Sequence, residues 1–147
     1  MTSNRRFVWE GWFSLVLPER WEMSEGSGVI SLYDPLNGVG ALQISLAQRT
    51  RQSPVDPSEA LDLAVEFAKQ KGWLDVSAAT QFICDGSPAS YFVFVEEGDE
   101  PTFWRVWHLL DRTRVALLTY NCALGSEDVE LSACEEVVES FRWQHTA

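Results

Sequence analysis

The sequence predicts a single α+β domain, residues 1–147, in which a mostly antiparallel sheet of six or seven strands is flanked by two helices. Three observations support this class. Segments of alternating apolar and polar residues, typical of half-buried strands, recur along the chain. Short connections such as Asp85-Gly86 require antiparallel neighbours. Two other segments repeat their apolar residues with helical spacing. The length of 147 residues suits one domain with one substantial core.

The first third of the chain predicts three strands, at 7–17, 29–33 and 40–47. The first is expected to be one long strand in which Phe13 and Leu15 share the apolar face. Gly11 interrupts that face, so it indicates a bulge or a bend. The pair Asn37-Gly38 predicts a hairpin turn between the second and third strands.

A helix is predicted at 57–71. Asp56 is expected to cap its first turn, with Pro57 following and Glu59 at the capping-box position. Gly72 is expected to end it, because glycine readily adopts the left-handed conformation found after a helix. The apolar stripe contains Ala60, Leu61, Ala64, Val65, Phe67 and Ala68.

Four strands and a second helix complete the prediction. The strands are expected at 77–84, 89–96, 102–111 and 114–121. Ser126 is expected to cap the helix, which ends near Ser140. Its apolar face contains Leu131, Cys134, Val137, Val138 and Phe141. Its acids are expected on a solvated face, and they are Glu127, Asp128, Glu130, Glu135, Glu136 and Glu139.

The order of these elements resembles the PsbP-like (Mog-type) α/β/α sandwich. Members open with an aromatic-x-Leu-x-Leu-Pro-x-x-Trp strand, matched here by Phe13, Leu15, Leu17, Pro18 and Trp21. Ser140-Phe141 matches the pair that ends their closing helix. The resemblance implies the sandwich fold and, more distantly, a similarity to Rhs-effector-associated secretion chaperones of bacteria. Since the group shares no activity, no functional residue is carried over.

The net charge of −11 is confined to one part of the chain. Residues 1–55 carry five acids and five arginines, whereas 56–147 carry seventeen acids and six basic residues. Such a surface repels phosphate backbones, which argues against nucleic-acid binding. It suits either a solvated surface, the favoured interpretation, or the recognition of a basic protein.

We expect a cytoplasmic protein that does not insert into a membrane. No apolar run approaches the length of a membrane span, and no signal sequence follows the first arginines. The three cysteines, Cys84, Cys122 and Cys134, are widely spaced and odd in number, which fits reduced thiols.

Catalytic, metal-binding and cofactor-binding residues are not predicted. His108 and Cys122 lie in neighbouring predicted strands, so a thiol–imidazole pair is conceivable. No acid or oxyanion loop accompanies them, and a hydrogen-bonded, half-buried histidine is the favoured interpretation. The histidines and cysteines lack the short spacings of a zinc site, and no phosphate-binding glycine loop is present.

The seven tryptophans suggest a partner surface, although burial on both sheet faces is the simpler explanation. The tentative surface consists of Trp12, Trp104, Glu96, Glu97, Asp99 and Glu100. Three functions compete. The favoured one is a non-catalytic protein-binding or chaperone-like module that uses the sheet edge or an aromatic patch. The others are an acidic immunity-type inhibitor of a basic toxin and a small enzyme built on His108 and Cys122. The expected partner is another protein, and a homodimer is left open.

Overall fold

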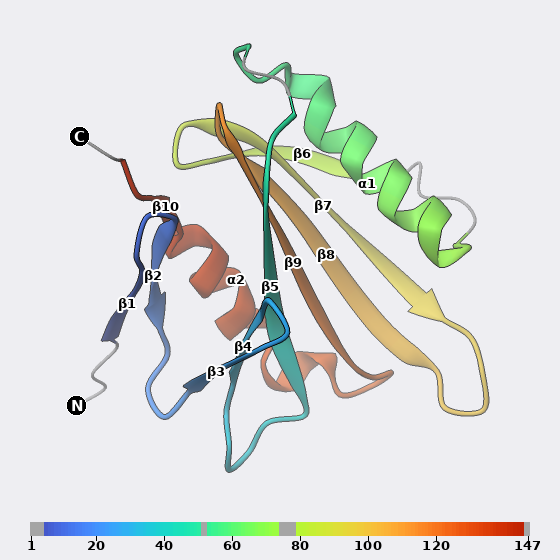
Figure 1. Cartoon of the computed structure of the whole chain (residues 1–147). Coiled ribbons are helices and arrows are strands. Elements are labelled where there is room, and N and C mark those ends of the chain that lie inside the picture. The colour runs from blue at the N-terminus through green and yellow to red at the C-terminus, as the bar shows by residue number, and fades with distance from the viewer. Residues whose placement is uncertain (1–4, 51–52, 74–78, 146–147) are drawn as a thin grey trace.

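The computed structural model describes residues 5–50, 53–73 and 79–145 (Figure 1). The strands are β1 Arg5–Trp9, β2 Phe13–Leu17, β3 Glu22–Gly26, β4 Val29–Tyr33, β5 Gly40–Gln48, β6 Thr80–Cys84, β7 Ser87–Glu96, β8 Thr102–Leu110, β9 Arg114–Ala123 and β10 Arg142–Trp143. The helices are α1 Pro57–Lys71, the short 3-10 helix η1 Glu127–Val129 and α2 Leu131–Ser140.

Seven of these strands form one antiparallel sheet in the order β3-β4-β5-β9-β8-β7-β6. A small sheet has the order β1-β2-β10. Helix α1 packs on one face of the large sheet, whereas α2 and the small sheet cover part of the opposite face (Figure 1). The predicted α+β class and its layered arrangement are therefore confirmed.

Local signals place α1 at its predicted bounds. The Asp56 carboxylate accepts a hydrogen bond from the Ser58 N–H at 2.9 Å, and Gly72 adopts a left-handed φ of 73°. Glu59 accepts hydrogen bonds from the Arg49 guanidinium at 2.6 Å for both pairs of atoms. Since Arg49 is buried at the end of β5, this ion pair ties the first turn of α1 to the sheet.

The long strand predicted at 7–17 is wrong, because this segment folds back as the β1–β2 hairpin. Gly11 has a φ of +80°, which allows the turn, and the Trp12 N–H donates to the Trp9 carbonyl at 2.9 Å. Trp9 then pairs with Phe13 across the hairpin. Paired residues of this hairpin, such as Trp9 and Phe13, point to the same face and are an even number of positions apart, so they would also share a face in one continuous strand. The alternation of apolar residues therefore could not distinguish a hairpin from a single strand.

Strands β3 and β10 were not predicted. All five residues of β3 are exposed, so it carries no apolar alternation. It is held by pairing with β4 through a turn at Ser27-Gly28, where both residues have positive φ, 54° and 79°. Strand β10 has only two residues and pairs with β2.

The start predicted for the second helix is also wrong. Ser126 makes no side-chain capping hydrogen bond and precedes η1, and α2 begins at Leu131. The predicted apolar face is nevertheless confirmed, because Cys134, Val137, Val138 and Phe141 are buried. Neither of the α-helices in the described ranges is long and apolar enough to cross a membrane.

The two faces of the large sheet are covered unevenly. Helix α1 lies over β6, β7 and β8, and on that same face β4 and β5 present polar residues such as Ser31 and Gln43 beside small or apolar ones. On the opposite face, β7 presents Tyr91, Val93 and Val95, which are only partly buried or exposed. An apolar part of the sheet thus lies beside α2 without full cover.

Candidate functional site

The two edges of the large sheet differ in how well they are protected against added strands. Strand β3 carries Glu22 and Glu25, and charged residues of this kind discourage edge pairing. Strand β6, with the sequence TQFIC, has no charge and no proline, and Ile83 is 68% exposed. Among the described residues no strand pairs with the outer side of β6, so this edge is open to pairing with another chain.

A hollow of about 180 Å³ lies between this end of the sheet and α2. It is lined by Phe82, Tyr91, Arg105, Trp107, Glu135, Val138 and Glu139. A second hollow, of about 380 Å³, shares Phe82, Val138 and Glu139 with the first and continues to Cys84, Asp85 and Arg142. We call the two hollows together the β6–α2 groove.

Arg105 lines the β6–α2 groove and contacts two of its aromatic rings. Its guanidinium carbon lies 4.2 Å from the ring centroid of Tyr91 and 5.3 Å from that of Trp107. Its Nη2 lies 3.3 Å from Glu135 Oε1, whereas its buried Nε has no hydrogen-bond partner among the described residues. Sequence reasoning missed this residue, although a cation between Phe103 and Trp107 on one strand face is a recognisable signal.

The positive and negative charges that line the groove do not cancel. Arg105 pairs with Glu135, and Arg142 Nε lies 3.9 Å from Asp85 Oδ1. Glu139 lines both hollows, is exposed, and has no ion-pair partner in the described part of the chain. The groove therefore carries one negative charge in excess.

The thiol of Cys84 is a structural group. Its Sγ donates to the Val138 carbonyl at 3.7 Å, which joins β6 to the end of α2. Burial, the main cause, together with nearby Asp85, raises the Cys84 pKa to about 11. The protonated thiol is a poor nucleophile at neutral pH.

A third hollow, of about 250 Å³, lies on the other side of the β6 edge. It is lined by Pro57, Gln81, Phe82, Ile83 and Pro88. We call it the Ile83 hollow. The exposed β6 edge thus has an aromatic groove on one side and an apolar hollow on the other.

His108 and Cys122 do not form the conceived pair. His108 faces α1, where its ring meets Phe67 at 6.1 Å, whereas Cys122 belongs to the core on the opposite sheet face. The register pairs His108 with Leu117, five residues from Cys122 along β9. His108 is also more buried than expected, at 5% exposure, and its Nδ1 has no hydrogen-bond partner among the described residues. Burial lowers its pKa to about 4.

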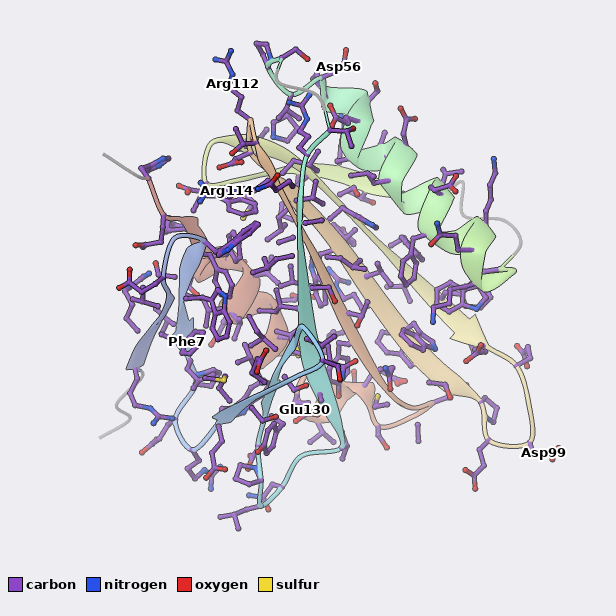
Figure 2. The ribbon with its side chains drawn as sticks, viewed as in Figure 1. Phe7, Asp56, Asp99, Arg112, Arg114 and Glu130 are labelled. Atoms are coloured by element: carbon purple, nitrogen blue, oxygen red, sulfur yellow. The ribbon has the colours of Figure 1, made fainter. Side chains whose placement is uncertain are left out.

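The tentative partner surface divides into two separate patches. Trp12 is half-buried, and its carbonyl accepts from Arg114 Nη1 at 3.2 Å. Trp104 packs on Trp73, and its Nε1–H donates to Glu96 at 3.3 Å. Figure 2 shows Arg114 far from Asp99, which lies at the tip of the β7–β8 loop. The structure therefore places Trp12 at one end of the sheet and the other residues, Trp104, Glu96, Glu97, Asp99 and Glu100, at the other end.

The expectation that all acids near α2 lie on a solvated face is wrong for Glu130. This residue is 6% exposed, and its Oε1 accepts from the Gly40 N–H at 2.8 Å, the Tyr120 hydroxyl at 2.9 Å and the Val39 N–H at 3.2 Å. Figure 2 shows Glu130 beside the lower part of β5, where it contacts Gly40. It is a structural carboxylate that joins η1 and α2 to the sheet.

No cluster of three or more metal-ligating side chains occurs in the described ranges.

No protein-family model matches the chain, and no curated protein matches it. Solved structures do. CyanoP, the PsbP protein of the cyanobacterium Synechocystis sp. PCC 6803, superposes with a TM-score of 0.71 at 16% identity, over 98% of this chain and 94% of that one.

Two further structures have similar lengths. LpqN, involved in cell envelope biogenesis of Mycobacterium tuberculosis, has a TM-score of 0.66 at 13% identity, over 99% of this chain and 91% of that one. A variant of Mog1 has a TM-score of 0.61 at 12% identity, over 95% of both chains. A protein of Bacteroides thetaiotaomicron has a TM-score of 0.71 at 16% identity, but this chain spans only about half of it, 48%.

These likenesses define the fold as the PsbP-like, Mog1-type α/β/α sandwich, as the sequence resemblance implied. At 12–16% identity they define the fold alone.

Proposed function

We propose that the protein is a non-catalytic binding module that holds an extended segment of another protein along the β6 edge and the β6–α2 groove. The observation that carries this proposal is the combination of an uncharged, exposed edge strand with an aromatic groove directly beside it. A module of this kind needs no catalytic group and no cofactor. The cytoplasmic location expected from the sequence stays a prediction.

The main chain of β6 supports strand addition. Asp85 and Gly86 form a two-residue turn with φ values of 50° and 76°, so Cys84 and Ser87 face each other across the hairpin. Since the N–H and C=O groups of successive residues point in alternate directions, those of Gln81 and Ile83 point away from β7. An extended peptide gains affinity from main-chain groups of this kind and specificity from neighbouring pockets.

The charge of the molecule favours a different protein over a second copy. At a net charge of −11, two copies repel each other, whereas a basic partner is attracted. The β7–β8 loop, with Glu97, Asp99 and Glu100 all exposed, adds to this attraction. A partner from another protein is therefore the occupant we propose.

Site-specific cross-linking tests the proposal. Photoreactive p-benzoyl-phenylalanine replaces Ile83 in one variant and Val129 in a matched control, because Val129 is 62% exposed on η1. Illumination in cells that produce the protein should link a partner at position 83 and not at 129. Mass spectrometry should map the link to an extended segment. Equal cross-linking at both positions, or links only to a second copy of the chain, would contradict the proposal.

The substitution Ile83→Lys should weaken binding of the cross-linked partner about ten-fold, because the added ammonium must lose water when a strand covers the edge. The control Val129→Lys should leave the dissociation constant unchanged. Calorimetric titration measures both values. Since both side chains are exposed, the midpoints of thermal unfolding should agree with that of the unmodified protein. Unchanged affinity in the β6 variant would place the partner elsewhere.

An acidic immunity-type inhibitor is the second candidate, favoured by the exposed acids of the β7–β8 loop. Neutralising Glu97, Asp99 and Glu100 together should then abolish partner binding. If the partner instead binds in the β6–α2 groove, the same change should only slow association. The difference in association rate between this variant and the unmodified protein should then disappear at high salt. Stopped-flow measurements of the association rate in low and high salt distinguish the two functions.

A further inference from the structure

The excess carboxylate of the β6–α2 groove indicates which side chain the bound segment carries. Resting on the proposed function, we propose that the groove selects a lysine or arginine at the position of the added strand that pairs with Phe82, between two apolar neighbours.

The direction of side chains along β6 sets this pattern. In a pleated sheet, directly paired residues on adjacent strands point to the same face. Phe82 lines the β6–α2 groove, so the residue paired with it enters that groove. The residues on either side of it pair with Gln81 and Ile83 and point to the opposite face. There the Ile83 hollow, formed largely by Pro57, Ile83 and Pro88, receives apolar side chains.

The groove itself suits a long cationic side chain. The Phe82 and Tyr91 rings, 5.8 Å apart, offer an apolar surface along which a methylene stem packs. Arg105 and Arg142 already have the partners Glu135 and Asp85, which leaves Glu139 to neutralise the incoming charge. An acidic residue at the same position would add a second uncompensated anion. A neutral residue would leave Glu139 without an ion pair.

Defined peptides test the selectivity. The probes are N-acetylated, C-amidated peptides of sequence Ser-Thr-Val-X-Val-Thr-Ser in which X is Lys, Gln or Glu. Titration followed by amide chemical shifts should move the Gln81 and Ile83 signals. Affinity should fall about three-fold from Lys to Gln and again from Gln to Glu, as expected for a solvent-exposed ion pair.

Two matched variants locate the preference. Glu139→Gln should remove the advantage of the Lys peptide over the Gln peptide. Glu136→Gln removes an exposed acid from the same helix, outside the groove lining, and should preserve that advantage. Both positions are on the helix surface, so loss of folding does not complicate the comparison.

Equal affinity for the Lys and Gln peptides, or a Lys preference that persists in Glu139→Gln, would overturn this inference. So would absence of shifts at Gln81 and Ile83 with all three peptides. The two proposals fail separately. If a partner is cross-linked at position 83 but the peptides show no Lys preference, only the selectivity inference is contradicted. If no partner is cross-linked there, the proposed function is contradicted, whichever peptide binds best.

Discussion

Replacing Glu130 with alanine is expected to lower the free energy of unfolding by about 3 kcal/mol. Glu130 Oε1 accepts from the Tyr120 hydroxyl and from two main-chain N–H groups that begin β5. Without the carboxylate, the fully buried Tyr120 hydroxyl loses the acceptor of its O–H, and each buried donor left unpaired costs about 1–3 kcal/mol. Val39 and Gly40 are not buried, so their N–H groups recover part of this free-energy cost by donating hydrogen bonds to water.

Urea denaturation at pH 7 measures the effect of Glu130→Ala. The control is Glu136→Ala, an exposed acid on α2 whose removal should change stability by less than about 0.5 kcal/mol. Tyr120→Phe should cost about 1 kcal/mol and, combined with Glu130→Ala, should add much less than its own cost, because both changes remove the same hydrogen bond. Additive costs would show that Glu130 and Tyr120 act independently.

Stability is expected to fall by about 3 kcal/mol as the pH decreases from 6.5 to 4, because of His108. Burial lowers its pKa from 6.5 to about 4 in the folded protein. The unfolded chain therefore binds the proton first, and protonation favours unfolding throughout this range. The contribution of neutral His108 to stability is complete above pH 6.5 and is lost once the pH falls below about 4.

Urea denaturation at several pH values between 7 and 4 measures this slope. In His108→Leu the decrease over this range should largely disappear, whereas His145→Gln, which removes the exposed histidine, should preserve it. Asp34 acts at lower pH, because the N–H groups of Leu36 and Asn37 hold its pKa below its usual value. A slope that persists in His108→Leu would assign the acid sensitivity to another group.

The elements that could be predicted are those with local signals. Helix α1 was found because Asp56, Pro57 and Gly72 mark its ends independently of the rest of the chain. Strand β3 was missed since it has no buried residue, and its pairing with β4 depends on the positive φ of Ser27 and Gly28. The start of α2 was misjudged because Ser126 precedes η1, a 3-10 helix whose acids resemble an ordinary first turn.

The candidate site depends on information that no local pattern contains. Tyr91 and Arg105 could be placed on strand faces, but the groove exists because α2 covers only part of its face of the sheet. Trp12 and Trp104, predicted to lie in a partner surface, are both half-buried against the protein itself. The lack of charge in TQFIC can be read from the sequence, but its position at a sheet edge is known only from the fold.

The small sheet has a consequence for how the protein assembles during synthesis. Strand β2 pairs with β10, and the Val16 N–H donates to the Ser140 hydroxyl at 2.8 Å across 124 positions of sequence. One side of β2 thus stays unpaired while the rest of the chain is translated. The final cooperative step must await residues 140–143, so nascent chains stalled before them should be sensitive to protease and should depend on holdase chaperones.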